Sequence, residues 1–462
     1  MDPLVSVVIP CHNGFPFLPE ALASVARQQA GDLEIIVVDD GSTDGSPAWA
    51  EQQPGVTVLR QPCRGPSAAR NAGIRAARGH FIALLDSDDW WPDYKLRLQL
   101  TWMALRPALQ VVHGRVRWRP EPGSALPDLN WETPDARLPM INLGAGLYRR
   151  GVFDRAGPLD ESLRFAEDVD FFLRVREKDL PLVVLRDVTL EYRIHPGGMT
   201  AGPAPTGLGM QDALMRSIRR RRAAGLTAPL APWNSFDEFA APTISVVIPV
   251  WNGERFLHQA IQSVLAQTMA PDEIIVADDG STDGSLRIAA GFGDRVRLLP
   301  AAHQGVSATR NRGVNAARGS LIAFLDADDL WLDDKLERQL ACFRDNPGAD
   351  IVYGWVEQFD HASGVARLPQ SGQFPSACLF RRGAWIRTGP FAESLRAGEF
   401  IDWVARARAA GLEEAHVDQV VARRRIHDRN YTRLQRENLA DYARLAKAAI
   451  DRRRAKPEGE AP

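Results

Sequence analysis

The feature that most constrains the fold of this chain is an internal repeat. Four blocks occur twice in the same order: "SVVIP" at Ser6 and Ser245, "DDGSTDGS" at Asp39 and Asp278, "LDSDDWW" at Leu85 answered by "LDADDLW" at Leu325, and "GPLDESLRFAEDVDFFLR" at Gly157 answered by "GPFAESLRAGEFIDWVAR" at Gly389. Each copy is as long as a domain, which excludes a short-period solenoid. The 462 residues also exceed what one hydrophobic core usually supports, so the sequence predicts two similar domains in tandem.

The repeat sets the expected domain boundaries. We expect a first domain at residues 1–205, a linker with a basic helix at 206–242, a second domain at 243–432, and a C-terminal helix and tail at 433–462. Within the tail, Leu434–Arg454 is predicted to be helical. The linker is assigned because it is rich in proline and alanine on both sides of its helix.

Within each copy, short apolar runs such as "VSVVIP", "LEIIVVDD" and "FIALLD" alternate with amphipathic stretches such as "LPEALASVARQQ". Strands that are apolar throughout and separated by helices are typical of a parallel sheet covered on both faces. The predicted fold class is therefore α/β, with two domains that each have a mostly parallel central sheet flanked by helices. In such sheets ligands bind at the carboxyl ends of the strands, where "DDGSTDGS" and "LDSDD" lie.

Composition and charge exclude several classes of function. The formal net charge of -2 gives no overall basic field for nucleic acid, and none is expected as a partner. We find no run of 18 apolar residues and no signal-peptide pattern. The four cysteines are scattered without a C-x-x-C spacing, which disfavours a zinc site or a disulfide scaffold. We therefore expect a cytoplasmic protein.

The acidic clusters carry the strongest chemical signal. Asp86 and Asp88 close an apolar strand, and crowded carboxylates repel unless a cation offsets their charge. A D-x-D pair suits a hard divalent ion, Mg²⁺ or Mn²⁺, that keeps positions for phosphate and water. The alternative is an Asp-rich surface loop, and for Asp39 and Asp40 it is a turn with an Asp cap. No P-loop or Rossmann glycine pattern occurs at a strand-to-helix turn.

Five ordered motifs, "VVIPCHN", "VVDDGSTDGS", "GPSAARNAG", "LDSDDWW" and "AEDVDFFLR", resemble the family 2 glycosyltransferases of the GT-A fold, once per repeat. The resemblance implies a nucleotide-diphosphate sugar donor, with a UDP-sugar expected, a divalent cation as cofactor, and inverting transfer to an acceptor hydroxyl. The acceptor would be a glycan, a lipid-linked molecule or a peptide, in the synthesis of cell-surface glycans.

The resemblance also implies roles for individual residues. Asp168 would be the general base, and Asp40 would read the base edge of the nucleotide. The nucleotide-binding positions are Pro10, Asp39, Asp40, Arg70 and Asp86, and in the second copy Pro249, Asp278, Asp279, Arg310 and Asp326. The metal positions are Asp86, Asp88 and His195, and then Asp326, Asp328 and His427; the acceptor side is Trp90, Trp91 and Trp331. A structural role for His195 is left open, and Glu167 and Asp170 are interpreted as exposed helix-start acids.

The two copies differ at one position that matters for catalysis. Asp168 is matched by Phe400, and an aromatic ring cannot accept a proton. Either Glu399 takes over as base, or the second copy binds a sugar nucleotide without efficient transfer. The first copy alone carries the insertion Arg119–Pro139, which we expect to contribute to an acceptor wall.

Two other functions stay open. One is a scaffold that holds sugar nucleotides without turnover, and the other is a two-activity polymerase resembling bacterial chondroitin-type synthases. The run Arg219–Arg222 is either a solvated helix face or a site that attracts anionic lipid head groups, which would bring the protein to the inner face of a membrane.

Overall fold

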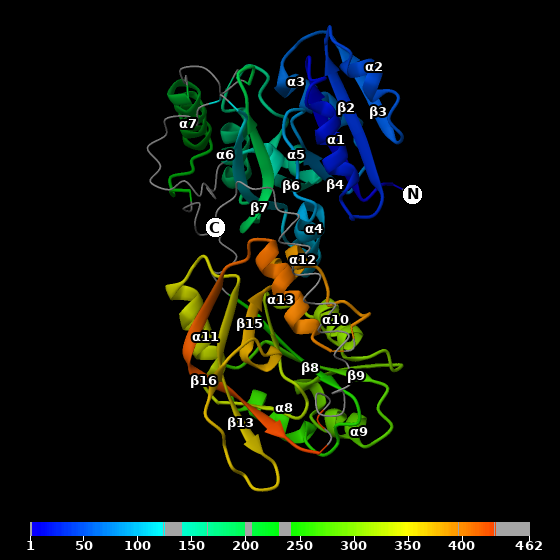
Figure 1. Ribbon diagram of the computed structural model, residues 1–462. Helices are drawn as coiled ribbons and strands as arrows, with labels where there is room; N and C mark the ends of the chain where they lie inside the picture. Colours follow the sequence, from blue (N-terminus) through cyan, green and yellow to red (C-terminus); the bar gives the residue numbers. More distant parts are fainter. Residues whose placement is uncertain are drawn as a thin grey trace. The chain divides into compact units, whose positions relative to one another are not determined.

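The computed structural model describes residues 2–122, 124, 141–163, 165–198, 206–230, 242–395, 397–428 and 430. The chain divides into two units, Met1–Ala240 and Ala241–Pro462, and each contains one sheet flanked by helices (Figure 1). The predicted helix Leu434–Arg454 and most of the insertion Arg119–Pro139 lie outside the described residues.

The sheet of the first unit has the strand order β3-β2-β1-β4-β6-β5-β7. Its strands are β1 (Val5–Cys11), β2 (Leu33–Asp40), β3 (Val56–Gln61), β4 (Phe81–Leu84), β5 (Val111–Pro120), β6 (Gly146–Arg149) and β7 (Leu182–Ile194). Its helices include α1 (Leu18–Ala26), α2 (Ser46–Ala50), α3 (Pro66–Ala76), α4 (Lys95–Leu105), α5 (Gly151–Ala156), α6 (Glu167–Glu177) and α7 (Thr206–Ala223). Neighbouring strands pair in parallel except around β6, which is antiparallel to β4 and to β5.

The second unit repeats this order as β10-β9-β8-β11-β15-β13-β16-β12, with β14 added beside β13. Its strands are β8 (Ile244–Val250), β9 (Glu273–Asp279), β10 (Arg297–Ala301), β11 (Leu321–Phe324), β12 (Leu330–Trp331), β13 (Ile351–Asp360), β14 (Gln370–Ser371), β15 (Cys378–Arg381) and β16 (Glu414–Ile426). Its helices include α8 (Leu257–Leu265), α9 (Ser285–Ala290), α10 (Val306–Ala316), α11 (Lys335–Asp345), α12 (Arg382–Thr388) and α13 (Glu399–Ala409). The predicted fold class, two α/β domains with mostly parallel sheets, is confirmed.

The apolar runs form strands because both sheet faces are covered. All seven residues of β1 are buried, and β1 lies between β2 and β4. The edge strand β3 instead exposes part of every residue. The continuous apolar pattern therefore marks the central strands and not the edge.

A close helix-to-strand approach explains one repeated glycine. A Cβ added to Gly73 of α3 would lie 2.3 Å from Val8 of β1, and one added to Gly313 of α10 would lie 2.3 Å from Val247 of β8. Any larger residue would push the helix away from the strand. This contact fixes α3, which carries Arg70, against the centre of the sheet.

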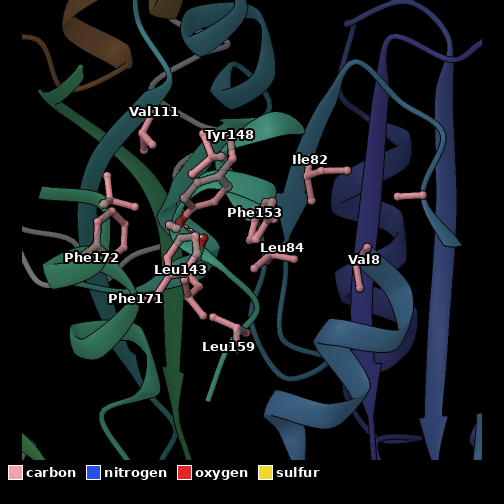
Figure 2. Close-up of a cluster of buried hydrophobic side chains, with 14 of the residues drawn as sticks. Val8, Ile82, Leu84, Val111, Leu143, Tyr148, Phe153, Leu159, Phe171 and Phe172 are labelled. Carbon is pink, nitrogen blue, oxygen red and sulfur yellow. Dashed lines mark hydrogen bonds between the residues drawn. The ribbon is translucent and has the colours of Figure 1, made fainter. Parts of the chain in front are cut away.

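The core of the first unit is aromatic on the side near α6. Tyr148 of β6, Phe153 of α5 and Phe171 and Phe172 of α6 gather beside the sheet (Figure 2). Phe153 and Phe171 are stacked with ring centroids 5.1 Å apart. This cluster holds the start of α6 in place.

The basic helix α7 belongs to the first unit, which differs from the expected linker at 206–242. Ala213 is fully buried against Val169 and Leu173 of α6. Arg220 pairs with Asp170 at 2.7 Å. Apolar burial and ion pairs attach α7 to α6, so the first unit extends beyond residue 205.

Among the described helices, none has both the length and the apolar character needed to cross a lipid bilayer.

Candidate active site

The first acidic motif, "DDGSTDGS", begins at the carboxyl end of β2. Asp40 ends β2 and is buried, and its carboxylate accepts hydrogen bonds from the Arg64 amide at 2.9 Å, the Gly65 amide at 2.8 Å and the Gln61 side chain at 2.7 Å. Gly65 has a φ of 93°, a conformation that glycine adopts without strain. Asp40 therefore positions the loop that leads into α3.

The second unit uses the same arrangement. Asp279 accepts from the amides of Gln304 at 2.8 Å and Gly305 at 2.9 Å, and His303 Nδ1 lies 2.9 Å from its Oδ2. The exposed Trp251 stacks on His303 with centroids 4.6 Å apart. In the first unit the position of Trp251 is occupied by His12, whose Nδ1 lies 2.9 Å from the Asp40 carbonyl oxygen. The walls beside the two aspartates therefore differ.

Asp39 and Asp278 are turn caps. Asp39 accepts from the Ser42 amide at 3.0 Å, and Asp278 accepts from the Gly280 and Ser281 amides. The cap interpretation describes these two side chains well. Pro10 and Pro249, also predicted to bind nucleotide, are buried within β1 and β8, so their nucleotide role stays a prediction.

Arg70 joins three segments of the first unit. This buried side chain donates from Nη2 to Asp86 at 2.6 Å and from Nη1 to Glu167 at 2.8 Å. A guanidinium is charged at all relevant pH values, so it offsets the repulsion between these carboxylates. The interpretation of Glu167 and Asp170 as exposed acids is wrong, because Glu167 is only 12% exposed and Asp170 only 1% exposed, and both are ion-paired.

Asp88 and His195 come together although they lie far apart in the sequence. His195 follows β7, and its Nε2 lies 3.2 Å from Asp88 Oδ2. The pKa of Asp88 is raised, first by burial and then by the negative charge of Asp86. In the second unit His427 Nε2 lies 3.0 Å from Asp328 Oδ2, and Asn430 donates to the same oxygen at 3.1 Å.

Sequence reasoning missed the arginine that fixes this turn. Arg193 donates from its backbone amide to the buried Asp89 at 2.9 Å and from Nε to the Asp88 carbonyl oxygen at 2.8 Å. Arg425 makes the same pair of contacts to Asp329 and Asp328. The signal was available in the sequence, because the tripeptide "RIH", which begins with this arginine and ends with the histidine, occurs in both copies.

The described residues do not supply a complete cation site. No group of three His, Cys, Asp or Glu side chains in the part of the chain that the structure describes lies close enough to hold a metal ion. Asp88 and His195 nevertheless offer one carboxylate oxygen and one imidazole nitrogen, a donor set that suits a divalent ion with further ligands from phosphate or water. The residues therefore fit part of the octahedral coordination shell that Mg²⁺ or Mn²⁺ requires.

Asp168 begins α6 in an environment that favours its neutral form. The half-buried side chain accepts a hydrogen bond from the Val169 amide at 2.7 Å. Loss of hydration, followed by the charge of Glu167, raises the pKa of Asp168 to about 7. Ala166, just before it, has a φ of 60°, which is unusual for a residue other than glycine. Backbone strain of this kind is common at functional sites.

The second unit replaces this environment with aromatic packing. Phe400 is 4% exposed and stacks on Trp403 with centroids 6.0 Å apart. Glu399 pairs with the buried Arg310, as Glu167 pairs with Arg70. Glu399 therefore corresponds in its contacts to Glu167 and not to Asp168.

A second difference lies near Asp168. In the first unit the buried Tyr148 hydroxyl donates to the Leu143 carbonyl at 3.0 Å (Figure 2), and the pKa of Tyr148 is raised by burial and then by the charge of Asp168. The matching residue of β15 is Phe380, which packs 5.2 Å from Trp403. Both polar groups of this region are thus absent from the second unit.

Two of the three tryptophans predicted on the acceptor side belong to the core. Trp91 is fully buried, donates to the Gly144 carbonyl at 3.1 Å and lies against Lys95. Trp331 is 3% exposed, so neither indole can line an open acceptor surface. Trp90 is partly exposed, with Arg193 stacked on its ring at 4.6 Å, and remains a candidate.

Comparison with known proteins identifies the family. The model for "Glycosyl transferase family 2" matches residues 6–153 and again residues 245–393. The chain belongs to glycosyl transferase family 2. Both matches lie within the two structural units, so the resemblance read from the five motifs is confirmed, and each unit carries one family 2 segment.

Similar proteins include bacterial glycosyltransferases and polysaccharide synthases. An uncharacterized glycosyltransferase of Rickettsia felis is 27% identical over 74% of this chain and 64% of its own length. The hyaluronan synthase of Pasteurella multocida is 24% identical over 92% of this chain and 50% of its own length, and the chondroitin synthase of Escherichia coli is 23% identical over 92% and 70%. This chain thus spans about half the length of that hyaluronan synthase.

Among solved structures, S. aureus TarS 1-349 in complex with UDP-GlcNAc has a TM-score of 0.40 and 21% identity, over 49% of this chain and 68% of that one.

Proposed function

We propose that the first unit transfers a sugar from a nucleotide-diphosphate sugar to an acceptor hydroxyl, with inversion, and that Asp168 is the general base. The observation that carries this proposal is the environment of Asp168. Its pKa of about 7 suits a group that must take a proton near neutral pH, and family membership supplies the class of reaction.

In this proposal the neighbouring residues set the geometry for the transfer. Arg70 holds Asp86 and Glu167 in ion pairs near the base, and Asp40 fixes the loop of residues 61–65 beside the nucleotide. Asp168 accepts the hydroxyl proton while the acceptor oxygen bonds to the sugar carbon and the diphosphate departs. A single displacement of this kind inverts the configuration at that carbon.

A divalent cation would be held by Asp88 and His195, with Asp86 beside them. When bound, it would stabilise the negative charge that develops on the departing diphosphate. In the second unit Asp328 and His427 occupy the same positions, with Asn430 hydrogen-bonded to Asp328.

We propose a different role for the second unit, which is to bind a sugar nucleotide with little transfer. Phe400 cannot take a proton, and the charge of Glu399 is already committed to Arg310. An aromatic wall formed by Trp251 and His303 stands beside Asp279, where a nucleotide base could stack.

A second candidate function is a polysaccharide synthase in which both units transfer sugars. The specific observation in its favour is the similarity to hyaluronan and chondroitin synthases over 92% of this chain. It requires that Glu399 or another group act as base in the second unit.

The test uses the full-length chain with a panel of sugar nucleotides and measures release of nucleoside diphosphate. Asp168→Asn should abolish nearly all metal-dependent transfer. If turnover of one donor survives, Glu399→Gln added to that variant shows whether Glu399 is its base. Glu167→Gln is the matched control. It disturbs the Arg70–Glu167 pair, which is equivalent to the Arg310–Glu399 pair, without removing the proposed base. A loss with Glu399→Gln far beyond that control would overturn the binding role of the second unit.

A further inference from the structure

Helix α7 exposes an apolar stripe that the first unit leaves uncovered. Four of its large apolar side chains are well exposed: Met210 at 45%, Leu214 at 44%, Met215 at 48% and Ile218 at 39%. Met210, Leu214 and Ile218 are spaced four residues apart and so lie on one face of the helix. Large apolar side chains gathered on one exposed face usually mark an interaction site.

The opposite face of α7 is the one that packs on the protein. Ala213 is fully buried and Ser217 is 4% exposed. Arg216 pairs with Asp160, and Arg220 with Asp170 and Glu177. The exposed stripe is therefore not the face that stabilises the unit.

The charge around the stripe is strongly positive. Helix α7 contains five arginines and one aspartate. The contacts above neutralise Arg216 and Arg220, and Arg221 donates to the Ala228 carbonyl. Arg219 and Arg222 are exposed, and no acidic side chain of the described residues contacts them. An apolar stripe bordered by such arginines is complementary to a surface that is apolar inside and anionic at its boundary.

The C-terminal segment of the chain matches this face poorly in charge. Leu230 packs against the buried cluster of Val169, Leu173 and Ala213, so the chain leaving α7 returns to the opposite side of the helix. Residues 431–462 carry eight Lys and Arg against five Asp and Glu, so their net charge has the same sign as the exposed arginines. Charge complementarity thus favours an anionic surface over residues 431–462 as the occupant of this face.

We propose that the exposed face of α7, formed by Met210, Leu214, Met215 and Ile218 with Arg219 and Arg222, docks the first unit on an anionic lipid bilayer. Helix α7 is joined to α6, which begins with Glu167 and Asp168, and Gly209 of α7 lies against the backbone of Phe165. Docking would therefore bring the start of α6 close to the membrane surface. The inference concerns binding alone, so vesicle binding and sugar transfer can fail independently.

The experiment is co-sedimentation of the full-length chain with vesicles of phosphatidylcholine containing about one third phosphatidylglycerol, against vesicles of phosphatidylcholine alone. We expect binding to the anionic vesicles that weakens as salt is raised. Arg219→Gln with Arg222→Gln should lower the partition coefficient about 25-fold, at about fivefold per arginine. Leu214→Gln with Ile218→Gln should lower it at least about tenfold through lost apolar burial.

The matched control is Val365→Gln with Leu368→Gln, which replaces two exposed apolar side chains of the second unit and should bind vesicles like the unaltered chain. Thermal unfolding of every variant checks that the fold is kept. The proposal is overturned if the unaltered chain does not bind anionic vesicles, or if Leu214→Gln with Ile218→Gln binds as well as the control. A third outcome also overturns it: the unaltered chain forms a dimer by light scattering but does not bind vesicles, and Leu214→Gln with Ile218→Gln abolishes the dimer. The face would then join two copies of the chain.

Discussion

At the scale of single residues, the two units differ in the group that follows the arginine-bound glutamate. Glu167 and Glu399 make the same contact with Arg70 and Arg310, so this acid is a shared structural element. The next residue is Asp168 in one unit and the packed Phe400 in the other. The two sites thus share the arginine–glutamate pair and differ at this residue, in addition to the change from Tyr148 to Phe380 and the Trp251–His303 wall beside Asp279.

The protonation of Asp168 should govern the pH dependence of transfer. Its pKa is raised to about 7, so the carboxylate that accepts a proton forms only as the pH rises through that value. We expect the rate of transfer to rise up to about pH 7 and then level off. Asp168→Asn should lower the rate about 100-fold to 10,000-fold and remove this rise, with little change in donor affinity. A pH profile that is unchanged in the variant would contradict the assignment.

Asp88 should be needed for metal-dependent turnover and not for folding. Its side chain is 36% exposed and its carboxylate lies 3.2 Å from His195 Nε2, so replacing it removes little packing. We expect Asp88→Asn to abolish transfer by the first unit while the thermal unfolding midpoint stays nearly unchanged. Excess EDTA should have the same effect on the unaltered chain. Full activity in EDTA would exclude the cation.

At the scale of elements, α7 packs on α6 and is paired with it through Arg220 and Asp170. Asp170 is 1% exposed and is held by Arg174 on its own helix and by Arg220 on α7. A buried carboxylate that loses a cationic partner is destabilised, because desolvation is no longer offset.

Replacing Arg220 by methionine should therefore destabilise the first unit. Arg220 is about one third exposed and Asp170 keeps Arg174, so we expect a loss of only about 1 to 2 kcal/mol. Arg219→Met is the control, because Arg219 is exposed and contacts no described acid, and it should change stability by less than about 0.5 kcal/mol. Urea unfolding followed by circular dichroism measures both. Equal stability of the two variants would show that the pair between the helices contributes nothing.

At the scale of the whole molecule, the chain consists of two units that each have their own sheet and core. Every strand of β1–β7 pairs within the first unit, and every strand of β8–β16 pairs within the second. Each unit should therefore fold without the other.

A fragment of residues 1–240 should unfold cooperatively, whereas one of residues 1–205 should be markedly less stable. The shorter fragment lacks α7. Its loss would expose Val169 and Leu173 to solvent and would leave Asp170 without its ion pair to Arg220. Differential scanning calorimetry of the two fragments and the full chain tests this. If the fragments unfold alike, α7 is a linker helix after all.

The sequence by itself determined the tandem architecture, the fold class and the family. These follow from local patterns, such as the apolar runs of β1 and β8 and the motifs at strand ends, which the repeat makes visible twice. Strand pairing needs only such patterns, because buried central strands are apolar along their whole length. The placement of Asp40 and Asp86 at the carboxyl ends of strands could be anticipated for the same reason.

Only the tertiary structure decided which charged and aromatic side chains meet. It buried Trp91 and Trp331 in the cores, paired Glu167 with Arg70, and joined α7 to α6 through Arg220. Sequence spacing cannot supply these contacts, because their partners come from elements far apart in the chain. Whether an acid is exposed or paired depends on such neighbours, so it is fixed only when the helices pack against the sheet.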